Sequence, residues 1–311
     1  MLQTGFKTRQ FMQLRIGTRK STLALTQAEI LQVKLMESFS ALSCELVPIV
    51  TTGDRKTGSL ADIGGKGLFT RELEEALLEK RIDIAVHSLK DMETHLPAGL
   101  VIGAVLARDD PRDAFVAKKR LTLTSLPRHA RVGTSSPRRT VQVKIARPDL
   151  EIVLLRGNVT TRLDKLRRGE VDATVLAFAG LKRLHLESEA TEILDTQRFI
   201  PAAGQGTIAV ECRDDDHALR EMLTAINDPL TYTATLTERS LLATVGGSCR
   251  TPIGAYARIE NGKLRLDAML AKPDGSAHAH VFREGNVSDA VALGKDAGAE
   301  LLARGAKDWL A

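Results

Sequence analysis

Short apolar runs alternate with amphipathic stretches along most of the chain, from about residue 14 to residue 212. Apolar runs of about four to eight residues indicate buried strands, and apolar positions spaced three and four apart indicate helices. The predicted strands are Leu14–Gly17, Glu45–Val50, Ile82–His87, Leu100–Leu106, Ala114–Ala117, Arg131–Gly133, Ile152–Leu155, Ala173–Ala177 and Ile208–Cys212. The predicted helices are Ser21–Phe39, Phe69–Lys80, Pro137–Ala146, Thr161–Arg168 and Asp215–Ile226. This alternation predicts an α/β fold with mixed, mostly parallel sheets, which bind ligands beyond the carboxyl ends of their strands.

Two of the strand-to-helix segments are near copies of each other. LRIGTRKSTLALTQA begins at Leu14, and ARVGTSSPRRTVQVK begins at Ala130. Each reads as an apolar strand, a Gly-Thr turn, further polar residues, and a Ser where a helix begins. Such a turn leaves backbone N–H groups unpaired at a helix start, where the helix dipole favours negative charge. Each copy is therefore predicted to form half of an anion cradle, with the two halves facing each other across a cleft.

Polar segments broken by proline mark where the chain is expected to pass between two lobes. RDDPRDAF, from Arg108, suits a first crossing, and PAAGQG, over 201–206, suits a return crossing. After residue 228 the pattern changes to a helix over Leu230–Val245, a hairpin at Asn261-Gly262 and a closing helix over Val287–Leu310. We predict three domains with the following bounds: 1–106 with 201–226 as a discontinuous α/β lobe, 107–200 as a second α/β lobe, and 227–311 as a small α+β domain.

Composition is consistent with two or three folded, soluble domains. The 311 residues are 43% hydrophobic and 27% charged, with a net charge of +5. No apolar run approaches the roughly 18 residues of a membrane span. The first 13 residues are basic and acid-free but lack a secretory apolar stretch, so a terminal arm is expected, with an organelle address as the alternative. Three cysteines without a CxxC pair favour a reducing, cytoplasmic setting.

Arginines gather at or just past the ends of predicted strands. Six share this placement: Arg19, Arg138, Arg139, Arg156, Arg162 and Arg183. The guanidinium fork grips carboxylates bidentately. One exposed pair contributes only about 0.2 to 1 kcal/mol, whereas several arginines converging in a partly dry cleft could hold a polyanion. Arg167 and Arg168 instead suit a solvent-facing helix surface.

Two motifs carry candidate chemistry. AVHSLKD places Asp91 at a cleft mouth, where a carboxylate among arginines could stabilise a cation formed during reaction; a helix-capping role is the alternative. GGSCRTPIG places Cys249 in a glycine-rich loop beside Arg250, which favours the nucleophilic thiolate; the alternative is a small residue filling a turn. His87 is interpreted as a hydrogen-bonded strand histidine, and Cys212 as a core residue.

Other features argue against competing classes of function. The glycine-rich stretch 51–67 is expected to be a functional loop, and its GGKG is not a GxxxxGK[ST] phosphate loop. His278 and His280 share a strand face without a third ligand nearby, so no metal is predicted. Aromatic residues are only 4% and do not interleave with the arginines, which disfavours nucleic-acid binding. A non-catalytic protein that binds a polyanionic small molecule stays open as the alternative to an enzyme.

Taken in order, these motifs resemble the porphobilinogen deaminases, also called hydroxymethylbilane synthases. The resemblance rests on GTRKS, GGKGLF, AVHSLKD, DDPRDAF, VGTSSPRR, LRGNV, LAFAGLKRL, PAAGQG and ERSLLATVGGSCRTPIG. It implies two lobes like those of periplasmic binding proteins and a third domain carrying a cofactor cysteine. It also implies a transferase of haem biosynthesis that condenses four porphobilinogen molecules into the linear tetrapyrrole hydroxymethylbilane and releases ammonia. The implied cofactor is a dipyrromethane joined by a thioether to Cys249, and a monomer without metal, nucleic-acid or membrane partners is expected.

The same resemblance assigns roles to individual positions. Asp91 matches the catalytic aspartate. The implied cofactor-binding residues are Cys249, Lys90, Ser88, Thr134, Ser135, Ser136, Arg138, Arg139, Arg156, Arg162 and Gly206. The implied substrate-binding residues are Arg19, Ser21, Lys66, Arg156, Arg162, Arg183 and Gln205. Asp62 stands where many members have a basic residue and Thr160 replaces a common Gly, but neither touches the cysteine or the aspartate, so an active enzyme is expected.

Overall fold

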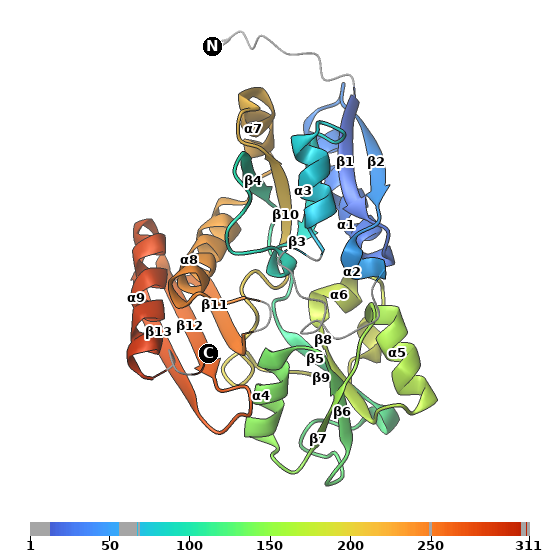
Figure 1. Cartoon of the computed structure of the whole chain (residues 1–311), viewed down its shortest axis with the longest axis vertical. Coiled ribbons are helices and arrows are strands. Elements are labelled where there is room, and N and C mark those ends of the chain that lie inside the picture. Colours follow the sequence, from blue (N-terminus) through green and yellow to red (C-terminus); the bar gives the residue numbers. More distant parts are fainter. Residues whose placement is uncertain (1–12, 56–66, 68, 249–250, 306–308, 310–311) are drawn as a thin grey trace.

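Three β-sheets organise the protein (Figure 1). The computed structural model describes residues 13–55, 67, 69–248, 251–305 and 309. The first sheet has the order β2-β1-β3-β10-β4, the second β7-β6-β8-β5-β9 and the third β11-β12-β13. The first two sheets confirm two α/β lobes, and the third confirms a small α+β unit that follows them in the chain.

The first lobe surrounds a five-stranded sheet. Its strands are β1 (Gln13–Arg19), β2 (Ser43–Ile49), β3 (Ile84–Ser88), β4 (Leu100–Val105) and β10 (Ile208–Arg213). Its helices are α1 (Thr22–Ser38), α2 (Thr52–Arg55), α3 (Arg71–Leu78) and α7 (His217–Thr224), with a short 3-10 turn at Leu89–Asp91. Leu31 and Leu35 of α1 pack on one face of the sheet, and Leu73 and Leu77 of α3 pack on the other. All four side chains are fully buried, so the sheet is covered on both faces.

The second lobe repeats this arrangement. Its strands are β5 (Asp113–Ala117), β6 (Arg131–Thr134), β7 (Glu151–Leu154), β8 (Ala173–Ala177) and β9 (Glu192–Ile193). Its helices are α4 (Pro137–Ala146), α5 (Val159–Arg168) and α6 (Phe178–Arg183), with 3-10 turns at Lys118–Arg120 and Glu187–Glu189. The strand orders place β1 and β6, the two near-copies in the sequence, in equivalent positions. Each pairs in parallel with two neighbours, and the rest of each sheet is antiparallel, so the sheets are less parallel than the alternation alone indicates.

The predicted Gly-Thr turns are wrong in one respect, because both dipeptides lie inside strands. A Cβ on Gly17 would lie 2.2 Å from Cδ1 of Ile82, and one on Gly133 would lie 2.7 Å from Cδ2 of Leu155. Both glycines therefore lie in close contact with neighbouring side chains inside the strands and do not form a turn. The predicted serine positions are confirmed, since Ser21 and Ser136 cap α1 and α4 through their hydroxyl oxygens.

The two predicted crossings lie side by side and are hydrogen-bonded to each other. Asp109 N donates to Gly206 O at 3.1 Å, and Arg108 Nε donates to Gln205 O at 2.8 Å. Gly206 has a φ of 89°, and a Cβ there would lie 2.5 Å from Asp109 O. Only glycine permits that approach. The two segments that connect the lobes are therefore packed directly against each other.

The third sheet is an antiparallel meander of β11 (Ile253–Glu260), β12 (Lys263–Ala271) and β13 (His278–Asn286). The predicted hairpin at Asn261-Gly262 is confirmed, with φ of 51° and 74°. Helices α8 (Pro229–Val245) and α9 (Ala290–Ala303) cover one face. Helix α9 is shorter than predicted at both ends: a 3-10 turn occupies Val287–Asp289, and the helix ends at Ala303. No helix in the described ranges is long and apolar enough to cross a membrane.

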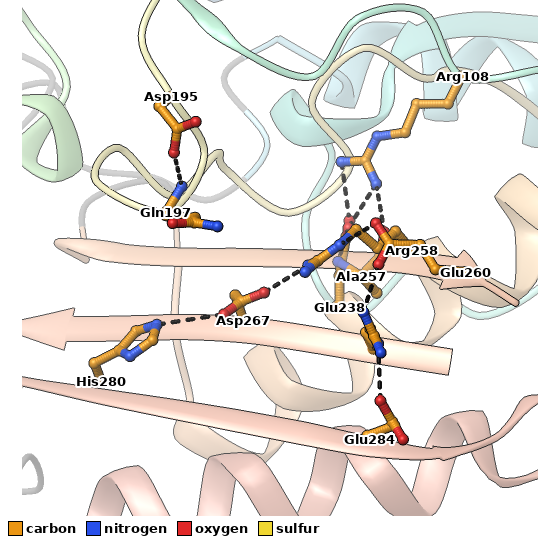
Figure 2. Close-up of polar contacts among 11 residues, drawn as sticks. Arg108, Asp195, Gln197, Glu238, Ala257, Arg258, Glu260, Asp267, His280 and Glu284 are labelled. Atoms are coloured by element: carbon orange, nitrogen blue, oxygen red, sulfur yellow. Dashed lines mark hydrogen bonds and ion pairs between the residues drawn. The ribbon is translucent and has the colours of Figure 1, made fainter. Parts of the chain in front are cut away.

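The other face of the third sheet carries charged side chains on part of its surface (Figure 2), while Met269 and Ala271 on the same face pack with Val141 and Ile200. Arg258 bonds Asp267 at 2.5 Å, and His280 lies 3.6 Å from the same carboxylate, so this histidine belongs to an ion-pair ladder. Arg108 Nη1 donates to Glu238 Oε1 at 2.6 Å, and the Glu238 side chain is fully buried. Glu238 also accepts from Gly204 N and Ala257 N. This carboxylate therefore ties both crossings to the third sheet.

Candidate functional site

The predicted catalytic aspartate lies on a short turn at the carboxyl end of β3. The strand runs directly into the 3-10 turn Leu89–Asp91. Leu89 is 2% exposed, and its N–H donates to Thr207 O at 3.0 Å, which anchors the turn on the return crossing. Ser88 Oγ accepts from Gln27 Nε2 of α1 at 2.9 Å. The fold thus holds this turn from two sides while the Asp91 side chain stays exposed.

Asp91 lines a small pocket of about 60 Å³ in the first lobe. Arg19, Ser21, Phe69 and Ser88 line it as well, and the Arg19 guanidinium lies 4.4 Å from the centre of the Phe69 ring. Sites for whole small molecules usually measure roughly 300 to 1,000 Å³, so this pocket suits one substituent, such as a carboxylate. A larger hollow of about 710 Å³ lies along another face of α1, but none of the predicted site residues lines it.

Two of the predicted arginines are buried against a carboxylate that the sequence analysis missed. Arg138 Nη1 lies 2.8 Å from Asp113 Oδ2, and Arg139 Nη2 lies 2.7 Å from Asp113 Oδ1. All three side chains are at most 6% exposed. Burial alone would raise the pKa of Asp113, but the two guanidiniums outweigh it and hold that pKa well below its usual range. The sequence did contain a sign of this pairing: Asp113 begins an apolar strand, and an aspartate that is buried needs a cation beside it.

Cationic side chains from the two lobes act on one another across this region. Burial and the neighbouring Arg139 lower the pKa of Lys90 to about 8, while Asp91 opposes this shift. Burial, Arg139 and Arg156 lower the pKa of Arg162 to about 10, and Asp91 again opposes the shift. Lys90 and Asp91 belong to the first lobe, whereas the three arginines belong to the second. These four cations and the Asp91 carboxylate, which acts on Lys90 and Arg162, thus belong to one electrostatic cluster.

The predicted hydroxyl residues of the second lobe, Thr134, Ser135 and Ser136, follow or end β6, near Arg162. Arg162 Nη2 donates to Ser135 Oγ at 3.3 Å, and its Nε donates to Gly157 O at 2.8 Å. Thr134 is only 2% exposed, and its Oγ1 accepts from Ser136 N at 3.2 Å. Ser135 and Ser136 are thus the more accessible hydroxyls. As predicted, Arg167 and Arg168 lie apart from the site, on the exposed face of α5, with carboxylate partners.

Three of the predicted site residues lie at the two crossings between the lobes, which we call the hinge, and not on an open surface. Arg183 Nη2 donates to Gly206 O at 2.6 Å, and burial lowers the pKa of this guanidinium. Gln205 is fully buried, and its Nε2 donates to Pro111 O and to Asp113 Oδ1. This burial favours a structural role for Gln205 and Gly206 over direct contact with a ligand.

Cys249, Lys66 and Asp62 lie outside the described residues. The residues that precede Cys249 are described up to Ser248. Helix α8 ends at Gly246, with a φ of 71°, and Gly247 O accepts from Thr94 Oγ1 at 3.2 Å. Arg239 Nη2 of α8 donates to Glu93 O and Thr94 O at 3.0 and 2.9 Å. The residues just before the cysteine are therefore hydrogen-bonded to the segment that follows Asp91. Arg239 and Thr94 make these bonds, and the sequence analysis did not single out either residue.

An Asp113→Asn variant is expected to lose about 3 to 5 kcal/mol of stability at neutral pH, because two buried guanidiniums would lose their counter-charge. Asp110→Asn is the matched control, since Asp110 bonds the partly exposed Arg112 in the same segment. Urea unfolding measures both. Because the folded pKa of Asp113 is depressed, its contribution is present above the ordinary aspartate pKa of about 3.9 and is lost as pH falls below it. Equal losses in the two variants at neutral pH would contradict this interpretation.

Comparisons with known proteins show the family of the chain. Residues 14–221 match the family model "Porphobilinogen deaminase, dipyromethane cofactor binding domain", and residues 232–303 match "Porphobilinogen deaminase, C-terminal domain". A curated porphobilinogen deaminase from Sorangium cellulosum is 48% identical over 294 residues, covering 93% of this chain and 98% of that protein.

Solved structures show a more distant likeness. A YaeC-family lipoprotein from Enterococcus faecalis is 12% identical, with a TM-score of 0.43 over 70% of this chain and 92% of its own. A TRAP periplasmic solute binding protein from Desulfovibrio salexigens is 10% identical, with a TM-score of 0.40 over 70% and 72%. Together the two family models span both lobes and the third sheet, and with the 48% identity they show that this chain belongs to the porphobilinogen deaminase family of tetrapyrrole-building transferases, which work on a dipyrromethane cofactor.

Proposed function

We propose that Asp91 is the catalytic carboxylate with which this transferase joins porphobilinogen units head to tail into hydroxymethylbilane and releases ammonia. The observation that carries this assignment is that Asp91 interacts electrostatically with a cation from each lobe, Lys90 and Arg162. Arg139 of the second lobe acts electrostatically on Lys90 of the first, Arg139 and Arg156 act on Arg162, and Asp91 acts on both Lys90 and Arg162. Each porphobilinogen carries an acetate and a propionate, so the growing chain is the kind of polyanion that such a cluster attracts.

The described residues fit a dipyrromethane, whose carboxylates need charged and hydroxyl donors. Burial and the charge of Arg139 lower the pKa values of Lys90 and Arg162, so an anion between these cations relieves the repulsion. The residues that would hold the cofactor are Ser88, Lys90, Thr134, Ser135, Ser136, Arg138, Arg139, Arg156 and Arg162, with Gly206 shaping the hinge beneath them. We assign the covalent thioether link to Cys249. When bound, the cofactor supplies the pyrrole carbon to which the next unit is joined.

Asp91 stabilises the charge that develops on the substrate. As ammonia leaves, positive charge spreads to the pyrrole nitrogen, and a carboxylate that accepts a hydrogen bond from this N–H lowers the barrier. The pocket beside Asp91, with Arg19 and Ser21 on its wall, accommodates one substrate carboxylate. Lys66, Arg156, Arg162 and Arg183 are assigned to further substrate carboxylates, and Gln205 supports them from the hinge.

Arg162→Leu is expected to lower kcat/KM roughly ten- to hundredfold, because a charge-assisted bond to a carboxylate contributes about 1.5 to 3 kcal/mol. Arg167→Leu is the matched control on the same helix, since Arg167 is exposed and pairs with Asp164 and Glu189. Steady-state assays of hydroxymethylbilane formation measure both variants. Unchanged kinetics in Arg162→Leu would remove this arginine from the site.

The finer assignments from the sequence are part of the same proposal. We propose a cytoplasmic monomer without nucleic-acid or membrane partners, which agrees with three cysteines that form no CxxC pair. The proposed domains are 1–106 with 201–226, 107–200, and 227–311. The hydrogen-bonded crossings near Asp109 and Gly206 support the boundary between the lobes.

A further inference from the structure

Glu93, two residues after Asp91, is bonded to two segments that are distant from it in the chain. It is half-buried, and its Oε1 accepts from Gly67 N at 2.8 Å. Its backbone O accepts from Arg239 Nη2 of α8 at 3.0 Å, and the O of Thr94 accepts from the same nitrogen at 2.9 Å. Glu93 therefore joins the end of the glycine-rich stretch to the small α+β unit.

Gly67 begins a hydrogen-bonded turn that leads into α3. Its O accepts from Thr70 N at 3.1 Å and from Arg71 N at 2.9 Å. Its φ of 71° suits glycine, and a Cβ there would lie 3.3 Å from Thr70 Oγ1. Glu93 holds the N–H of this residue and the start of α3 holds its O, so Gly67 is fixed at both of its polar atoms. We call residues 67 and 69–71 the Gly67 turn.

The Gly67 turn supplies one wall of the pocket that Asp91 lines. Phe69 and Thr70 both line this pocket. The Arg19 guanidinium, on the same wall, lies 4.4 Å from the centre of the Phe69 ring, which is the geometry of a cation–π contact. A shift of the turn would move the ring and, with it, the guanidinium. The position of the Arg19 charge therefore depends on the position of the turn.

We propose that Glu93 is a positioning residue, whose bond to Gly67 N holds the Phe69 wall of the pocket in place for one substrate carboxylate. Glu93 is not among the described residues that line the pocket, so it acts through the turn and not by contact with the bound carboxylate. Arg239 holds the same stretch of backbone from α8. The effect on substrate rests on the proposed function of the pocket, whereas the bond to Gly67 does not.

Three substitutions of Glu93 separate the hydrogen bond from the charge. Glu93→Gln removes the charge but keeps an Oε1 that accepts. Glu93→Asp keeps the charge but is one methylene shorter, so its carboxylate is drawn away from Gly67 N. Glu93→Ala removes both, and Glu93→Asp carries the test if the alanine variant does not fold. Glu79→Ala is the matched control, because Glu79 lies at the far end of α3 and its exposed carboxylate pairs with Arg81.

Hydrogen exchange of the Gly67 amide, measured by NMR on the holoenzyme, tests the bond directly. We expect this amide to be protected in wild type, Glu93→Gln and Glu79→Ala. In Glu93→Asp and Glu93→Ala we expect it to exchange about tenfold faster, the effect of losing one hydrogen bond. This readout does not depend on turnover.

Steady-state kinetics with porphobilinogen test the effect on the pocket. In Glu93→Asp and Glu93→Ala we expect KM to rise about tenfold while kcat stays within about twofold, because binding that is common to substrate and transition state is lost. Glu93→Gln should recover most of the wild-type KM. A merely structural role would instead lower kcat with the folded fraction and leave KM unchanged. Intact mass checks that each variant carries its cofactor.

The proposal is overturned if Gly67 exchange is unchanged in Glu93→Asp and Glu93→Ala, or if Glu93→Gln loses as much protection as Glu93→Ala. It is also overturned if Gly67 exchange becomes faster and KM stays at the wild-type value, while Arg19→Leu raises KM. If Arg19→Leu leaves KM unchanged as well, the pocket binds no substrate carboxylate. That result would contradict the proposed function of the pocket and leave the bond to Gly67 standing, so the two ideas fail in different experiments.

Discussion

An Asp91→Ala variant is expected to keep its covalent cofactor and to lose kcat by about two to three orders of magnitude, the usual effect of removing one preorganised group that stabilises transition-state charge. The carboxylate is held at the end of β3 by the anchored Leu89 and the Ser88–Gln27 bond, so removing it leaves the turn in place. Single-turnover measurements of ammonia release test the chemical step, and intact mass reports the cofactor.

Two further variants make the result specific to Asp91. Asp91→Glu keeps the charge but moves the carboxylate, and we expect it to recover only part of the lost rate. Asp164→Ala removes a carboxylate of α5 that pairs with the exposed Arg167, and we expect wild-type turnover. Turnover close to wild type in Asp91→Ala would remove this residue from its catalytic role.

A Cys249→Ala variant is expected to lack the adduct altogether and to show no measurable turnover, because the thioether has no other anchor in the proposed site. Intact mass spectrometry is the direct measurement, since wild-type protein made in pyrrole-competent cells should be heavier than its sequence by two pyrrole units. Cys44→Ala is the matched control: Cys44 lies half-buried in β2, and burial raises the pKa of its thiol, which disfavours the nucleophilic thiolate.

The mass measurement also separates an enzyme from a binding protein with the same two-lobed cleft. A wild-type protein of unmodified mass would favour a non-catalytic binder, which needs neither the cysteine nor Asp91. An adduct that survives in Cys249→Ala would move the attachment to another residue. Either result would contradict the assignment of Cys249.

Two of the arginines in the proposed site are already paired with a buried carboxylate of the protein. Arg138 and Arg139 are predicted ligand-binding residues, yet both are buried against Asp113. Asp113 is also bonded by Gln205 of the return crossing, so the same carboxylate holds the arginines and the hinge. A movement of the crossings would therefore shift these guanidiniums directly, which couples the relative position of the lobes to the binding of the acidic chain.

Local patterns in the sequence determined most of the helices and strands and indicated the family. The apolar runs and the capping serines placed the nine predicted strands and the start of both cradle helices, because strand burial and N-capping depend on residues close together in the chain. The resemblance carried by the ordered motifs predicted Asp91, Lys90 and the arginines as site residues. The Asn261-Gly262 hairpin was equally local, since it requires two consecutive residues with positive φ.

Tertiary structure alone decided which charges are matched. Asp113 reaches Arg138 and Arg139 across 25 and 26 positions, Glu238 reaches Arg108 across 130, and Glu211 reaches His87 across 124. No rule based on neighbouring residues predicts these pairings. Each depends on how the sheets and crossings bring together segments that are far apart in the sequence. The role of Gly17 was misread for the same reason: the side chain of Ile82, 65 positions away, excludes a Cβ there. At Asp113 the paired guanidiniums also hold the pKa of the buried carboxyl well below its usual range, since charges removed from water must be paired or neutralised.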